Sequence, residues 1–179
     1  LEVITEDRFV HPVDDDFDLI IRANPDPSTE LAGRCFLRDM QAVVAAPSLP
    51  RPMRQRDVRV PAITLPRMPT EASWQLSRAR SVLTVTTRTV LRLSSMAMIH
   101  DAVLAGVGAA AMPRWLVQAD IDADRLIDWG TLADRPIEVW ALYPSHRHVS
   151  ARVTAFVRLL VDRFENASPT AFAKLAIRG

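Results

Sequence analysis

The sequence has little of several residue types, and each shortage excludes a class of protein. Cys35 is the only cysteine among 179 residues, which excludes an internal disulfide and any multi-cysteine zinc or iron–sulfur site. A reducing compartment, and therefore the cytoplasm, is the expected location. No stretch reaches the roughly 18 uninterrupted apolar residues of a membrane-spanning helix. No basic segment followed by an apolar run opens the chain either, so we expect neither membrane insertion nor secretion.

The chain also lacks a strong charge of either sign. Lysine and arginine together number 22 and aspartate and glutamate 21, which gives a formal net charge of +1. Nothing at the level of the whole chain therefore favours a nucleic acid, an anionic membrane or an acidic partner. What the chain does have is 49% hydrophobic and 24% charged residues, the composition of an ordinary globular protein. We expect one domain, or one domain made of two lobes.

Short β-branched runs alternate with helical patterns, which is typical of α/β proteins built on parallel strands. The run at 18–22 is apolar on both faces and is predicted to be a central strand. The other predicted strands cover 1–5, two successive runs within 31–46, 62–65, 74–76, 82–87, 108–112, 125–129 ending at Gly130, and 137–143. Helices are predicted over 7–17, from Ser94 or Ser95 to Gly106, over 115–119, and after Ser150.

Four blocks, in this order, resemble the effector-binding domain of LysR-type transcription regulators. The first two are Asp18-Leu19-Ile20-Ile21-Arg22 and Val43-Val44-Ala45-Ala46-Pro47. The third runs from Ala102-Val103-Leu104-Ala105-Gly106-Val107-Gly108 into Met112-Pro113-Arg114-Trp115-Leu116-Val117. The fourth is Tyr143-Pro144-Ser145-His146-Arg147-His148, continuing through Ser150 to Phe156. Together they span most of residues 1–165.

The resemblance implies an α/β fold with two Rossmann-like lobes, like that of type II periplasmic binding proteins, and a ligand cleft between the lobes. Lobe I would comprise 1–46 and 144–165, lobe II with the crossover strands 47–143, and 166–179 would be a tail. The family's own first strand and helix would lie upstream of Leu1, so we expect them to be missing from this chain. Many relatives have Asn-Asp where this sequence has Ser94-Ser95, which leaves open which effector groups are recognised.

Candidate effector-binding residues follow from this placement. A helix that begins at Ser94, Ser95 and Met96 would present free backbone N–H groups and a positive dipole end, which suit an anion such as a carboxylate. Arg22 could pair with an acidic effector, and a structural salt bridge or a plain surface arginine is the alternative. The remaining candidates are less specific, and hinge packing is the simpler interpretation of the last two: Thr5, Ser48 and Pro113.

Other suggestive patterns have simpler explanations. His146 and His148 have no third metal ligand nearby, and His100 and Asp101 are helix neighbours that point in different directions. Asp14 to Asp16 lack the ligand spacing of a calcium loop, and Cys35 is predicted to be a buried small hydrophobe. The four tryptophans are too dispersed for nucleic-acid stacking and are assigned to packing. Catalytic motifs are absent, so we expect no cofactor, no metal site and no enzyme.

The expected function is therefore regulatory. A small molecule would bind between the lobes and control transcription through an absent winged helix-turn-helix, which alone would contact DNA. The resemblance also implies a homodimer or homotetramer. Two rivals remain: a periplasmic-type solute-binding protein, which a signal peptide upstream would favour, and an enzyme on the same fold, for which no acid, base or nucleophile is apparent.

Overall fold

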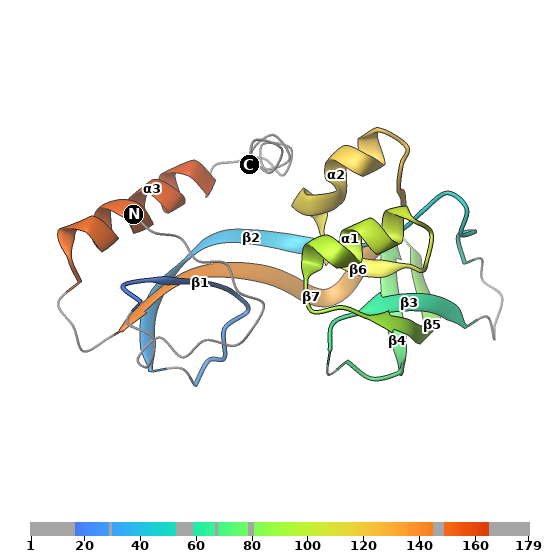
Figure 1. Cartoon of the computed structure of the whole chain (residues 1–179), viewed down its shortest axis with the longest axis horizontal. Coiled ribbons are helices and arrows are strands. Elements are labelled where there is room, and N and C mark those ends of the chain that lie inside the picture. Colours follow the sequence, from blue (N-terminus) through green and yellow to red (C-terminus); the bar gives the residue numbers. More distant parts are fainter. Residues whose placement is uncertain are drawn as a thin grey trace. The chain divides into compact units, whose positions relative to one another are not determined.

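The computed structural model describes residues 17–28, 30–52, 59–66, 68–78, 81–144 and 149–164, without the side chains of 134 and 135 (Figure 1). The chain forms two compact units, whose described residues are 17–38 with 137–164 and 39–136. The lobe boundaries expected at residues 46 and 144 stay a prediction. The expected elements within 1–16, the pair His146 and His148, and the tail at 166–179 lie outside the described residues.

The described residues of the first unit form three strands and one helix. Its strands are β1 (Ile20–Ala23), the first part of β2 (Leu31–Ala45) and the last part of β7 (Ile127–Pro144). β1 pairs antiparallel with β7, from Ile20 opposite Leu142 to Ala23 opposite Val139. The parallel arrangement predicted for this segment is therefore wrong for this pair. The alternating pattern did not distinguish the two directions, and a loop with no helix joins β1 to β2.

Helix α3 (Ala151–Phe164) belongs to the same unit and has the predicted cap and apolar face. The Ser150 hydroxyl accepts a hydrogen bond from the backbone N–H of Val153 at 3.3 Å, which satisfies one donor that the first turn leaves unpaired. Val153 and Leu160 are buried, seven residues apart on one face of the helix. At the helix end, the ring of Phe164 lies 5.6 Å from that of Phe36 on β2.

The second unit is a curled sheet in the strand order β3-β5-β4-β7-β2-β6. The strands not yet introduced are β3 (Val60–Thr64), β4 (Glu71–Arg78), β5 (Ser81–Arg92) and β6 (Ala110–Pro113). β4 and β5 form an antiparallel hairpin, and β3 pairs with β5 in parallel. A parallel bridge between Ala62 and Ala109 then joins the two ends of the strand order.

Two helices accompany this sheet, α1 (Met96–Leu104) and α2 (Arg114–Asp122) (Figure 1). α1 begins and ends where the sequence predicted. Ser95 occupies its N-cap position, and Gly106 follows its end with a φ of 78°. That left-handed conformation is one that glycine adopts at little cost, which explains why the helix stops there. None of the helices in the described part of the chain has the length and apolar character of a membrane span.

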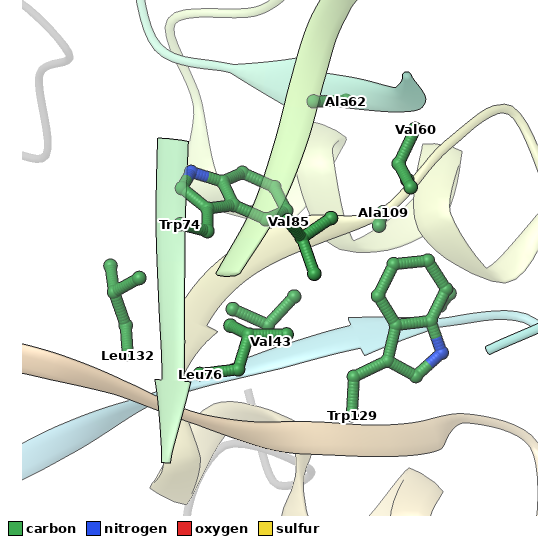
Figure 2. Close-up of a cluster of buried hydrophobic side chains, with 10 residues drawn as sticks. Val43, Val60, Ala62, Trp74, Leu76, Val85, Ala109, Trp129 and Leu132 are labelled. Atoms are coloured by element: carbon green, nitrogen blue, oxygen red, sulfur yellow. The ribbon is translucent and has the colours of Figure 1, made fainter. Parts of the chain in front are cut away.

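Strand β2 contributes alternate residues to two separate cores, because successive side chains point to opposite faces of a sheet. Val43 and Ala45 join one core, in which Trp74 and Trp129 are the largest members and Val85 lies between them in Figure 2. Ala42 and Val44 join the other core, under α1 and α2, together with Ile99, Val103, Met112 and Val117. The prediction that the tryptophans serve packing is confirmed for Trp74 and Trp129, which are 7% and 1% exposed.

Two predicted strand ends are wrong. The runs within 31–46 form one 15-residue strand, β2, although two residue types common in turns, Gly33 and Asp39, lie within it. Gly130 does not end a strand but lies inside the 18-residue β7, with a φ of 136° that only glycine adopts easily. The sequence pattern showed that these segments were strands but not that they were continuous.

Cys35 is half-buried rather than buried as predicted, and its Sγ lies 3.4 Å from the carbonyl oxygen of Leu37.

Candidate functional site

The N-terminus of α1 lies at the carboxyl end of a parallel strand pair. β3 ends at Thr64 and β5 at Arg92, and these two residues are partners in the parallel register. The backbone N–H of Leu93 donates to the carbonyl oxygen of Thr64 at 3.0 Å, after which the chain passes through Ser94 and Ser95 into α1. The carboxyl ends of parallel strands are where open α/β sheets bind their ligands.

No side chain in the first turn of α1 compensates the positive end of the helix dipole. Ser95 has the extended backbone of an N-cap residue, but its hydroxyl makes no capping hydrogen bond. The first turn contains no acidic residue, and Ser94 is exposed. The first N–H groups of a helix have no acceptor within the helix, so this end suits an anion or another hydrogen-bond acceptor.

Helix α2 begins in a different way. Pro113 occupies its N-cap position and has no side-chain donor or acceptor to offer. The carboxylate of Asp39, on β2, takes over this role: its Oδ2 accepts from the backbone N–H of Trp115 at 2.9 Å. α2 is therefore capped by a negative charge from the neighbouring strand, whereas the described residues supply α1 with no such side-chain cap.

Thr64 adds a polar group that the sequence analysis did not single out. Its Oγ1 is buried and has no hydrogen-bond partner among the described residues. A buried hydroxyl without a partner costs roughly 1–3 kcal/mol, so such an atom in a native fold calls for an explanation. The signal in the sequence was a threonine at the carboxyl end of a predicted strand, and it was overlooked because it belongs to none of the blocks that carry the family resemblance.

The surroundings of this helix end are apolar. Four side chains from the ends of β3 and β5 and the start of α1 are partly buried against the second core: Leu65, Leu91, Leu93 and Met96. Hydroxyl and N–H groups framed by aliphatic side chains suit a ligand with one acidic end and an apolar body.

The other predicted residues of the second unit fall at two different edges of the sheet. The bridge between Ala62 and Ala109 makes β6 parallel to β3, so Pro113, the last residue of β6, lies at the same carboxyl edge as Thr64. Ser48 lies at the opposite edge, because a Cβ on Gly106 would come within 2.9 Å of its Oγ. The nine residues of α1, about 13 Å at 1.5 Å per residue, therefore separate Ser48 from Ser94 and Ser95.

Arg22 belongs to the first unit. It is half-buried on β1 directly opposite Trp140 of β7. On β7, two residues before Trp140, Glu138 pairs with Arg38 at 2.9 Å and accepts from the Trp140 indole N–H at 3.1 Å. The hydrogen bond from Arg38, and to a smaller extent that from Trp140, holds the pKa of Glu138 below its usual range. Thr5 lies outside the described residues, so Ser94, Ser95 and Met96 are the predicted residues that the structure places beside Thr64.

One further polar cluster was missed. The side chains of His100 and Asp101, predicted to point in different directions, approach each other: Nδ1 of His100 is 3.7 Å from the exposed Asp101 carboxylate. Nε2 of His100 lies 2.7 Å from Oδ2 of Asp120 on α2, whose side chain is only 8% exposed. Neither residue stands in a recognisable motif, since 20 positions separate them. No group of three or more metal-ligating side chains occurs within the described ranges.

Several known proteins similar to this chain are transcription regulators or regulatory domains. The transcriptional regulator PtxR of Pseudomonas aeruginosa is 29% identical over 169 residues, which cover 89% of this chain and 53% of PtxR. The probable regulator LtrA of Klebsiella pneumoniae is 26% identical over 181 residues, which cover 94% of this chain and 58% of LtrA. The chain thus spans little more than half the length of these curated relatives.

Among solved structures, the regulatory domain of CrgA from Neisseria meningitidis superposes with a TM-score of 0.67 at 20% identity, covering 84% of this chain and 76% of that domain. This likeness establishes the predicted fold class, the two-lobed α/β architecture of type II periplasmic binding proteins. The family model described as "LysR substrate binding domain" matches residues 1–165. The chain therefore belongs to the LysR substrate-binding domain family, the effector-sensing regulatory domains of LysR-type transcription regulators.

Proposed function

We propose that this chain senses a small molecule with an acidic group and an apolar body, and that the open N-terminus of α1 forms the acid-binding part of the site. The observation that carries the proposal is the unpartnered Oγ1 of Thr64 beside that helix end. Ser94 and Ser95 supply further hydroxyls, and the first N–H groups of α1 supply donors. Arg22 stays a predicted contact of an acidic effector.

The whole regulator would act through a DNA-binding module that precedes this domain, as in the helix-turn-helix regulators that the chain resembles. With a net charge of +1 the chain itself offers little to neutralise phosphates, so we propose that it contacts DNA only through that module. A homodimer or homotetramer acting in the cytoplasm is the proposed assembly. A solute-binding role in transport is not favoured, because the matched relatives are transcription regulators.

The test uses benzoate as an acidic, apolar probe and benzamide as its neutral counterpart. A ligand that binds only the folded chain raises its thermal midpoint in proportion to RT ln(1 + [L]/Kd). We expect benzoate to raise the midpoint and benzamide to have no effect. Thr64→Val, which removes the hydroxyl at nearly constant volume, should reduce the benzoate shift while leaving the stability of the free chain unchanged or higher. Thr84→Val, at an exposed position on β5, is the matched control.

A purely structural Thr64 hydroxyl would give the opposite result, because its removal would destabilise the free chain. Equal shifts with benzoate and benzamide, or an unchanged benzoate shift in Thr64→Val, would overturn the proposed acid-binding site. The family assignment does not depend on this outcome.

A further inference from the structure

Helix α2 is tied to α1 through a buried carboxylate. Asp120, near the C-terminal end of α2, is 2.7 Å from Nε2 of His100 on α1. Its other oxygen, Oδ1, accepts from Nε of Arg125 at 2.7 Å and lies 2.7 Å from Nη2 of the same guanidinium. An ionised carboxylate can only accept hydrogen bonds, so Nε2 of His100 is the donor. The Asp120 side chain is 8% exposed and that of His100 21%, so solvent replaces this contact poorly.

The opposite end of α2 is tied to strand β2. The Asp39 carboxylate accepts from the backbone N–H of Trp115 at 2.9 Å through Oδ2, and from the N–H of Met40 at 2.7 Å through Oδ1. Asp39 is also where β2 enters the second unit, since Arg38 belongs to the first. The start of α2 is therefore fixed to a strand that runs on into the other unit.

A third contact joins α2 to strand β7. Nη2 of Arg114, the first residue of α2, is 2.7 Å from Oδ2 of Asp128. Oδ1 of the same carboxylate accepts from the backbone N–H of Gly130 at 2.8 Å, which fixes the side chain on its own strand. β7 leaves the second unit after Pro136. Both strands that connect the two units are thus held by the first turn of α2.

We propose that α2 couples the position of α1 to the two connecting strands. The contact between His100 and Asp120 links α1 to α2, and the contacts of Asp39 and Asp128 link α2 to β2 and β7. A shift of α1 would move the end of α2 through the buried carboxylate, and α2, as a rigid helix, would pass the movement to β2 and β7. That a ligand at the N-terminus of α1 provides the shift rests on the proposed function. The mechanical coupling itself does not, and it is tested without ligand.

The experiment is hydrogen–deuterium exchange on the full chain, read by mass spectrometry. His100→Leu removes the donor to Asp120. We expect backbone exchange to accelerate at least tenfold in residues 39–44 of β2 and 127–132 of β7, compared with less than threefold in the β4–β5 hairpin of the same unit. His100→Gln, which keeps an N–H donor, should stay within about twofold of the unmodified chain. Glu71→Gln, which removes the exposed ion pair with Arg59, should leave the connecting strands unchanged.

Three results would overturn the proposal. Acceleration confined to α1 and α2 would mean that the cluster is only a local clamp. Equal acceleration in the hairpin and the connecting strands would mean a general loss of stability. In an Asp39→Ala background, His100→Leu should no longer accelerate residues 39–44, so the same fold-change there would exclude transmission through Asp39. If His100→Leu does not fold, Asp120→Asn is measured by the same criteria. Failure of the benzoate experiment affects none of these outcomes.

Discussion

Replacing Gly130 with alanine should destabilise the chain strongly, because the residue combines an unusual backbone conformation with a close contact. Its φ of 136° is accessible almost only to glycine, and another residue held there costs about 1–3 kcal/mol. A Cβ would also lie 2.9 Å from the carbonyl oxygen of Ser77, a backbone atom of β4. Moving it away would disturb the register in which Ser77 lies opposite Thr131 and Leu76 opposite Leu132.

Together these effects give an expected loss of about 3 kcal/mol in the free energy of unfolding, within a range of roughly 2–4 kcal/mol. For a chain of this size such a loss lowers the melting temperature by about 6–12 °C. Urea denaturation followed by circular dichroism measures the free energy, and scanning calorimetry measures the temperature.

Gly106→Ala is the matched control. Its φ of 78° is also positive, but the nearest atom to an added Cβ is Oγ of Ser48, the end of a side chain that can rotate away. The expected loss is therefore only about 1 kcal/mol. A loss at Gly130 no greater than that at Gly106 would refute the reasoning, and would indicate that β7 is interrupted at Gly130 after all.

Three other changes test the packing, capping and charge of the fold. Val103→Ala, at a fully buried position of α1, should cost about 2–3 kcal/mol of unfolding free energy in urea titrations, whereas Val82→Ala, 64% exposed, should cost less than about 0.5. Ser150→Ala should cost about 1 kcal/mol by removing the α3 cap, and a loss below about 0.3 would contradict the capping role. Because Arg38 and Trp140 lower the pKa of Glu138 in the folded chain, that carboxylate contributes stability above its ordinary pKa and loses it as the pH falls through the lowered value. The stability difference from Glu138→Gln should therefore be largest near neutral pH and shrink in acid; a difference independent of pH would exclude this role.

The sequence was most informative where local chemistry decides the structure. The apolar spacing of Val153 and Leu160, the cap at Ser150 and the stop at Gly106 each depend on residues within a few positions, and these helix limits were correct. The family resemblance added the fold class, because it drew on blocks far apart in the chain.

Pairing between distant strands was not accessible in the same way. The antiparallel direction of β1 against β7 depends on residues more than a hundred positions apart. The continuity of β7 through Gly130 depends on the approach of Ser77, which no local pattern encodes. A glycine between two apolar runs indicates a turn as readily as it indicates a bulge inside a strand.

The same distinction between local patterns and contacts of distant segments applies to the candidate site. Ser94, Ser95 and Met96 could be named because a helix start has a recognisable pattern and because the family resemblance places this helix end at the ligand cleft. Thr64 and the contact of His100 with Asp120 could not, because burial and partnership arise only when β3, α1 and α2 come together. Ser48 was expected at the interlobe crossing, with hinge packing as the simpler interpretation; it lies beside Gly106, past the C-terminal end of α1, and its role stays a prediction.

The bridge between Ala62 and Ala109 has a consequence for the solubility of the second unit. β3 and β6 stand at the two ends of the strand order, and strands in such positions usually expose backbone groups that can recruit strands of another molecule. Here the backbone N–H of Ile63 donates to the carbonyl oxygen of Ala109, and the backbone N–H of Ala109 donates to the carbonyl oxygen of Pro61, both at 2.9 Å. The two ends of the sheet thus occupy each other's free hydrogen-bonding groups. Curling the sheet onto itself protects the unit against edge-to-edge aggregation.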